Sequence, residues 1–486
     1  MRPKLPAGMF LLGVLVMAVS LAPVQAQSIA PPRSFITPDA TGAPSSGQED
    51  GSTAGAATQN RTENAAPITL EQMEQIALAN NPTLNQARAN VDAATGRARQ
   101  AGLWPNPVIG YTGEEIRGGS FGGGEQGAFV EQDIILGGKL SLDRKVLGER
   151  EKETEAERDA QRLRVQNGVR IAFYQSLAAQ EMWAARQKLG EIAEDAVETT
   201  RQLFNVGQAD QPDLLEAQVE ADEADLASST AQQEQMSAWR TLVAIAGKPE
   251  MPLTRLAGNL EELPLEDPDH MLQAILRDSP AVRIARLEVA RADAKLARAR
   301  RQNVPDLFVR AGYMDNHEQL APELPFTVGS EGFAEVGVNL PLFDRNQGNI
   351  PAAQADRERA ELEAQRVSLS LQQQAAPILQ DYATSRAAAE RYRTRTIPNA
   401  DEAYQLYLRK YREGAAAYPQ VLIAQRTFFQ LETAYIAEVE RAWVSAAALQ
   451  GLLLTDGLDA PGAANETEQM APTGNMRMAG AQEQLR

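Results

Sequence analysis

The sequence predicts an α+β membrane protein in which two versions of one unit each combine barrel-type strands with very long helices. The first observation is an internal duplication: residues 204–218 and 411–425 keep glycine, proline, leucine, alanine and glutamine in register at one offset. The second is a pair of segments in each half where apolar residues alternate with polar or small ones. The third is the proline-free run 139–205, which as a helix would reach about 100 Å.

The two ends of the chain lack these patterns. Residues 1–26 predict a signal peptide, because Arg2 and Lys4 precede a short apolar run and a small-residue cleavage site. That run, of about 14 residues, is too short for a membrane-spanning helix, which needs roughly 20. Residues 27–67 and 458–486 are rich in Pro, Ser, Thr, Gly, Ala and Gln, so we expect a disordered tether and a disordered tail.

The first structural repeat, residues 68–250, begins with a helical pattern over 70–101. Pro105 and Pro107 end it, because proline removes a donor and fixes φ. Two strands, the long helix 139–205, a glycine turn and a return helix follow. A linker at 251–268 leads to the second repeat, residues 269–457, with the same order. The strands are expected at about 108–117 and 128–136 in the first repeat and 306–314 and 332–341 in the second.

The alternation in these strands is typical of a membrane barrel, with apolar side chains toward lipid and polar ones toward a wet lumen. Four strands per chain are too few to close such a barrel. Unpaired strand edges in lipid cost several kcal/mol per group, so the chain is expected to assemble with closed cyclic symmetry. Three copies supply twelve strands, an even number in the observed range.

The composition excludes several classes of function. The chain of 486 residues has no cysteine, so neither a disulfide framework nor a thiolate metal site is possible. Its net charge of −18 argues against nucleic acid as a partner. His270 and His317 are too few and too far apart in sequence for a histidine metal cluster or a catalytic triad. We therefore expect no enzyme, no cofactor and no metal site.

Several motifs together resemble the TolC-like outer-membrane efflux channel family over about residues 68–457. They are Asn81-Pro82, the segments 101–107, 132–139 and 339–345, and the two glycine turns. The sequences of segments 101–107 and 136–139 are similar to those of the branch that serves heavy-metal cation exporters of the resistance-nodulation-division type. The resemblance implies a homotrimer with a twelve-stranded barrel in the cell outer membrane. It also implies a long helical coiled-coil tunnel extending into the periplasm, and a periplasmic adaptor and an inner-membrane pump as partners.

The resemblance also implies a docking tip for the adaptor at the turns between the paired long helices. Val206, Gly207, Glu413 and Gly414 match those turns. The alternative is that the glycines only supply the positive φ of a helical hairpin; both can hold.

Channels of this family narrow near the tip through acidic side chains one turn beyond the glycine. Asp213 and Glu216 occupy these places in the first copy, whereas Gln420 and Ile423 occupy them in the second. The constriction is thus expected from the first copy alone. The alternative is a solvated helix start with a capping Asp.

The function implied is the outer-membrane channel component of a tripartite efflux system, with heavy-metal cations as cargo. An acidic lumen, which would concentrate cations, favours the same cargo. A general duct for drugs or other small molecules is the alternative. From another class, a periplasmic coiled-coil adaptor or structural protein would share the helical hairpins but would need no duplicated strands.

Overall fold

A computed structural model describes residues 66–116, 124–265, 267–319, 327–413 and 415–461. The expected signal peptide, almost all of the expected tether and tail, and Gly414 therefore lie outside the described residues. The chain divides into units 1–57 and 58–486, and the description concerns the second. Its helices are α2 (Leu70–Asn80), α3 (Pro82–Ala101), α4 (Lys139–Asn205), α5 (Gln211–Ile245), α6 (Pro268–Asp278), α7 (Pro280–Arg301), α8 (Asn349–Arg391), the π-helix η1 (Tyr392–Thr396), α9 (Ile397–Arg412) and α10 (Tyr418–Gln450).

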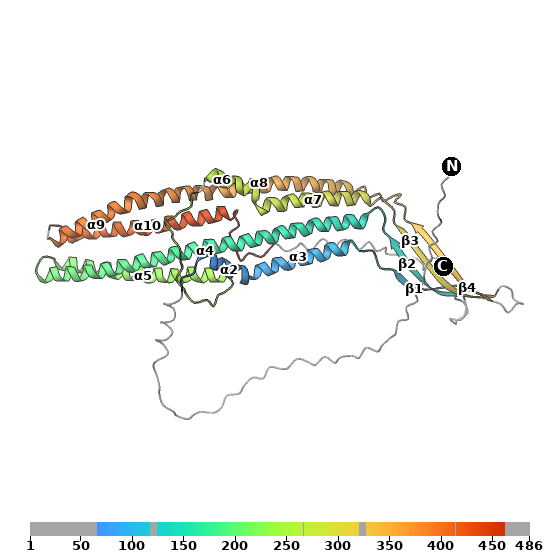
Figure 1. The fold of residues 1–486 in the computed structure, drawn as a ribbon, viewed down its shortest axis with the longest axis horizontal. Coiled ribbons are helices and arrows are strands. Elements are labelled where there is room, and N and C mark those ends of the chain that lie inside the picture. The colour runs from blue at the N-terminus through green and yellow to red at the C-terminus, as the bar shows by residue number, and fades with distance from the viewer. Residues whose placement is uncertain (1–65, 117–123, 266, 320–326, 414, 462–486) are drawn as a thin grey trace, which may run out of the picture. The chain divides into compact units, whose positions relative to one another are not determined.

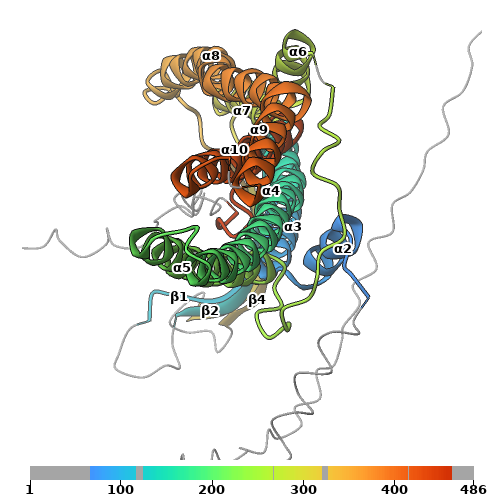
Figure 2. The same ribbon diagram turned by 90° about the vertical axis from the view of Figure 1, so that its left-hand side faces the viewer.

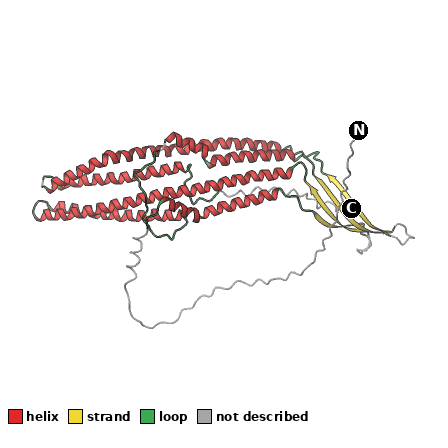
Figure 3. Ribbon diagram, viewed as in Figure 1, coloured by secondary structure: helices red, strands yellow, loops and turns green. Residues whose placement is uncertain are grey.

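Within this unit each repeat supplies two short helices, two strands and a pair of long helices. The four strands are β1 (Val108–Glu114), β2 (Glu125–Ile134), β3 (Leu307–Gln319) and β4 (Thr327–Val338). They gather at one end of the helices, and the turns α4–α5 and α9–α10 lie at the other end (Figures 1 and 3). Viewed along their length, the helices form a curved wall rather than a solid bundle (Figure 2).

The long helix α4 is continuous over its 67 residues, as the proline-free run predicts. Its counterpart in the second repeat is divided into α8, η1 and α9, with Pro377 inside α8 and a proline at the start of α9. Proline removes a backbone donor, and a π-helical turn also interrupts the regular α-helical hydrogen bonds; both are known causes of helix bending. The two repeats thus share one plan but differ in the continuity of their long helices.

The helical pattern over 70–101 is not one helix, which corrects the sequence prediction. Asn81 has extended backbone angles and separates α2 from α3, since Pro82 disfavours a helical residue before it. The Asn81 side chain accepts a hydrogen bond from the Thr83 N–H at 2.9 Å and donates from Nδ2 to the Ile245 carbonyl at 2.8 Å. The break therefore fastens the first helices to the end of α5.

The strands form one antiparallel sheet in the order β1-β2-β3-β4, so the two hairpins join through β2 and β3. The first hairpin is shifted from its expected bounds: Gly124, with φ of 81°, precedes Glu125, and Glu125 starts β2 opposite Glu114. The second extends further from the helices, since the β3–β4 ladder continues through the polar residues Asp315 and Asn316. Backbone pairing, rather than apolar alternation, sets these ends.

Candidate functional site

One face of the sheet carries exposed apolar side chains. Paired residues of neighbouring strands point to the same face, and alternate residues along a strand point to opposite faces. The register thus places six large apolar residues together, each between 48% and 77% exposed. They are Ile109, Tyr111, Val130, Tyr313, Val336 and Val338. A cluster of exposed apolar side chains on one face of a sheet suits a lipid environment.

The opposite face, which we call the inner face, is acidic. The same register brings six carboxylates to it, and Arg310 is the one Lys or Arg within the four strands. The carboxylates are Glu114, Glu125, Glu131, Asp133, Glu331 and Glu335. Charged groups avoid hydrocarbon, so this face belongs toward water.

The outer edges of the sheet are open. Among the described residues, β1 pairs only with β2, and β4 only with β3. A sheet with one apolar face and two unpaired edges cannot remain alone in lipid, because each unpaired N–H or C=O there costs several kcal/mol. The geometry requires strands from other chains to complete it.

The junction between sheet and helices explains the segment Leu136-Gly137-Gly138-Lys139. Gly137 and Gly138 have φ of 73° and 71°, the left-handed region that favours glycine. They turn the chain from β2 into α4, and Lys139 then meets Asp306 at 2.9 Å while 3% exposed. Asp306 also accepts the Leu136 N–H at 2.9 Å. Asp306, which precedes β3 in the second repeat, thus fixes the junction between β2 and α4 in the first repeat.

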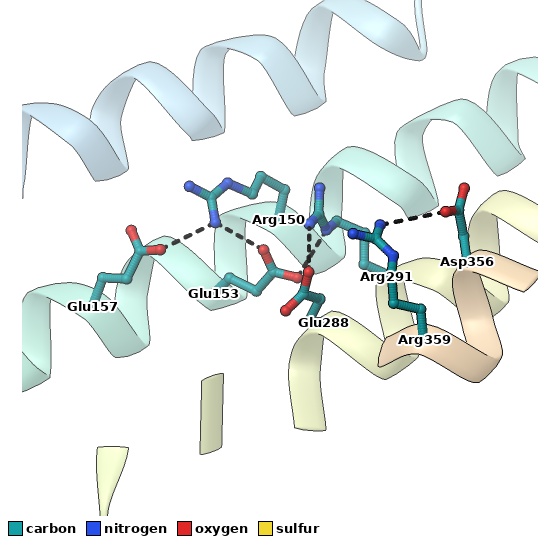
Figure 4. Close-up of polar contacts among 7 residues, drawn as sticks. All are labelled: Arg150, Glu153, Glu157, Glu288, Arg291, Asp356 and Arg359. Atoms are coloured by element: carbon teal, nitrogen blue, oxygen red, sulfur yellow. Dashed lines mark hydrogen bonds and ion pairs between the residues drawn. The ribbon is translucent and has the colours of Figure 1, made fainter. Parts of the chain in front are cut away.

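Buried ion pairs join α4 to α7 beyond this junction (Figure 4). The carboxylate of Glu153 lies 2.8 Å from Arg150 on its own helix and 2.9 Å from Arg291 on α7, with its side chain only 1% exposed. Arg150 also contacts Glu157 at 3.1 Å, and burial raises the pKa of that carboxyl. Asp143 and Arg298 make a further α4–α7 pair at 2.6 Å. These contacts hold the two repeats together where the helices leave the sheet.

The helical tip contains the residues expected to dock a partner. Val206 caps the C-terminal end of α4 and is 70% exposed, and Gly207 has φ of 78°. Glu413 caps the C-terminal end of α9 and is exposed, with its N–H donating to the Arg409 carbonyl at 3.1 Å. Gly207 therefore does supply positive φ, and the two turns present their side chains to solvent. Docking itself stays a prediction.

The two expected constriction residues have different surroundings. Asp213 forms a capping box with Asp210: the Asp213 N–H donates to the Asp210 carboxylate at 3.1 Å, and the Asp210 N–H donates back at 3.3 Å. Glu216 is exposed one turn further along α5. The local contacts of Asp213 thus match the capping alternative. Glu216 takes no part in the capping box.

A third acidic residue, which sequence reasoning missed, joins the two hairpins near the tip. Glu220 on α5 is 8% exposed and accepts from Nε of Arg426 on α10 at 2.7 Å. Close by, burial followed by the Glu220 charge raises the pKa of the Tyr418 hydroxyl. The ring of Tyr418 packs against Tyr411 at 5.7 Å between centroids. Only the arrangement of α5 against α10 reveals this pair, since nothing in either segment alone indicates its partner.

No described helix combines the length and the apolar character needed to cross a membrane. Within the same ranges, no group of three or more His, Cys, Asp or Glu is placed to hold a metal ion.

Comparison with known proteins decides the family. The model of the family described as "Outer membrane efflux protein" matches residues 74–248 and 271–453, one segment in each repeat. The chain belongs to the outer membrane efflux protein family. This outer membrane efflux protein is 30% identical over 396 residues to the cobalt-zinc-cadmium resistance protein CzcC of Cupriavidus metallidurans, covering 80% of the chain and 91% of CzcC.

Two further relatives of this outer membrane efflux protein are named for metal resistance and for toluene efflux. The nickel-cobalt-cadmium resistance protein NccC of Alcaligenes xylosoxydans xylosoxydans is 29% identical, over 60% of the chain and 64% of NccC. The toluene efflux pump outer membrane protein TtgC of Pseudomonas putida is 25% identical, over 76% of the chain and 79% of TtgC. The solved structure of VceC from Vibrio cholerae matches the fold with a TM-score of 0.65 and 18% identity, over 80% of this chain and 96% of VceC.

The expected fold class and function are confirmed by these matches. The outer membrane efflux protein has the fold of TolC-like channels, with four strands for an outer-membrane barrel and long helices extending into the periplasm. It is an outer-membrane channel component of an efflux system. Its family consists of channels rather than enzymes.

Proposed function

We propose that this chain forms a homotrimeric channel that receives heavy-metal cations from an inner-membrane pump through a periplasmic adaptor and releases them outside the cell. The observation that supports heavy-metal cations as the cargo is the 30% identity with a cobalt-zinc-cadmium resistance protein over 91% of that protein's length. The acidic inner face of the sheet supports it, since such a surface concentrates cations and repels anions.

Unpartnered apolar stripes on the helices support the assembly of several chains. Leu215, Val219 and Leu226 on α5 are each more than half exposed, and their spacing places them on one helix face. Leu362 and Leu369 form a second such stripe on α8. Exposed apolar surface in contiguous patches marks contacts with other molecules. Three chains would cover these stripes and close a twelve-stranded barrel in the same step.

The tip residues support the adaptor as a partner. Val206 and Glu413 are exposed on turns at the end of the helices remote from the sheet, which is the end that reaches furthest into the periplasm. Exposed loop residues on a rigid scaffold are common sites of partner binding. Together with Gly207, and with Gly414 outside the described residues, they form the proposed docking tip.

Gene deletion tests the cargo. We expect loss of growth on zinc, cobalt, nickel or cadmium salts at concentrations that the parent strain tolerates, with recovery when the wild-type gene is restored. A panel of hydrophobic drugs is measured in parallel. Unchanged metal tolerance with lost drug tolerance would contradict the metal assignment and favour the general duct. Unchanged tolerance to both would contradict an efflux role under these conditions.

The constriction is tested separately in single-channel recordings. Glu216→Gln removes a carboxylate that takes no part in the capping box, so the helix start is preserved. We expect a lower cation preference, because one negative charge per chain is lost near the tip. Asp213→Asn combined with Glu216→Gln should lower it further. An unchanged preference in both would assign these carboxylates to an ordinary solvated helix start.

A further inference from the structure

The inner face of the sheet holds a single cation between two acidic neighbours. Arg310 on β3 pairs in register with Glu131 on β2 and with Glu335 on β4. Cross-strand neighbours of opposite charge ordinarily form ion pairs. Among the described residues, however, no ion pair joins Arg310 to either carboxylate, and its Nε is buried without a hydrogen-bond partner. Something other than a carboxylate determines where this guanidinium lies.

Aromatic rings hold the guanidinium instead. Its central carbon lies 3.9 Å from the centroid of the Phe129 ring and 5.7 Å from that of Phe333. A cation over an aromatic face within about 6 Å is attracted by the ring quadrupole, and arginine is the cation most often found there. Arg310 is therefore a charge fixed against the wall rather than a mobile side chain neutralised by its neighbours.

Two glycines allow these rings to lie against the wall. A Cβ at Gly110 would come within 2.4 Å of the Phe129 ring, and a Cβ at Gly312 within 2.5 Å of the Phe333 ring. Real Cβ atoms do not approach so closely, so any larger residue at either position would lift the ring. The platform beneath Arg310 is thus specified by the sheet itself, through phenylalanine on one strand opposite glycine on the next.

We propose that Arg310 is a specificity-determining residue of the barrel lumen: a fixed positive charge that limits the cation preference set by the six inner-face carboxylates. The inference rests on the proposed trimer, in which the inner face becomes the lumen wall. The guanidinium lies over the rings and, within the described part of the chain, forms no ion pair with Glu131 or Glu335. Cations pass along a wall that attracts them, and one positive charge per chain weakens that attraction.

Bilayer recordings of the purified full-length channel test this assignment, with potassium chloride as the only probe. The cation-to-anion permeability ratio is taken from the reversal potential across a salt gradient. We expect Arg310→Gln to raise the ratio about twofold or more, because a unit charge within a Debye length of the ion path is removed. Arg310→Lys keeps the charge and should leave the ratio near the wild-type value.

Two further variants keep the test decisive. If Arg310→Gln does not insert, Arg310→Met offers an uncharged, unbranched side chain that can pack on the same rings. Glu335→Gln, the neighbour of opposite charge, should lower the ratio. Pores whose ratio is unchanged by either neutral substitution of Arg310 would overturn the inference while leaving the channel intact. Absence of any pore from the wild-type protein would instead contradict the proposed function.

Discussion

Glu153 has a side chain that is 1% exposed and is held by arginines of both repeats. A charge so far from water is stable only while its partners remain, since its desolvation is offset by Arg150 and Arg291. Exposed pairs such as Arg366–Glu363, in which both partners remain hydrated, are of a different kind. At the residue scale, buried ion pairs such as those between α4 and α7 are therefore expected to contribute more to stability than the exposed ones.

Replacing Arg291 by Met leaves Glu153 with one partner and tests this distinction. We expect a loss of roughly 3–5 kcal/mol in unfolding free energy, the range for breaking a buried pair by removing one side. Helix unfolding followed by circular dichroism in detergent measures it. The control, Arg366→Met on the exposed face of α8, should leave unfolding unchanged. Equal effects of the two substitutions would show that burial does not set the importance of these pairs.

Glu157 gives a pH dependence with a defined sign. Burial raises the pKa of its carboxyl, so the folded protein retains a proton at a pH where the unfolded chain has lost it. Stability from this group therefore falls as pH rises from the unfolded pKa to the higher folded pKa. Glu157→Gln removes that fall, and the stability of the variant relative to wild type should increase between pH 4 and pH 7. A difference that is flat with pH would contradict it.

At the scale of elements, the bounds of α4 follow from sequence because no proline interrupts it and Gly137, Gly138 and Gly207 limit its ends. The apolar and acidic faces of the sheet also follow from alternation. The extension of β3 beyond residue 314 does not, since Asp315 and Asn316 break the apolar alternation although their backbones still pair with β4. Pairs such as Glu220–Arg426 lie outside sequence reasoning, because they depend on which helices become neighbours.

The turn after α4 can be altered without changing the packing of the rest of the fold, since a Cβ at Gly207 would meet no atom within 4 Å. Gly207→Pro is incompatible with the observed φ of 78°, since proline fixes φ near −65°. We expect export to be lost while the protein still reaches the outer membrane, measured by metal tolerance and by membrane fractionation.

A glycine within α4, the helix that precedes this turn, provides a matched control. Gly148→Ala adds a Cβ that meets no atom within 4 Å, so it should preserve export and stabilise α4 by about 0.5–1 kcal/mol. If Gly207→Pro also removes the protein from the membrane, the turn is a folding element and not only a docking one.

On the scale of the whole molecule, the open sheet is the strongest argument for several chains. The natural chain has no cysteine, so a pair introduced at the two edges reports contact between chains without background. We combine Thr112→Cys on β1 with a cysteine replacing Glu331, Phe333 or Glu335 on β4, all on the inner face.

At least one combination should give oxidised species up to the trimer and none larger, because three chains close the ring. Single variants serve as controls and should remain monomeric on denaturing gels. Cross-linked ladders beyond the trimer would contradict closure at three chains.

The open edges also constrain how the channel is made. A newly secreted chain bears two unpaired edges and an apolar face before any partner is present, the features that lead strands to aggregate. We therefore expect its survival in the periplasm to depend on how soon other copies, or a chaperone, cover the hairpins. Barrel closure then becomes a reaction between chains, with a rate that rises steeply with their concentration. Low expression should therefore delay maturation more than it lowers the final amount of each chain.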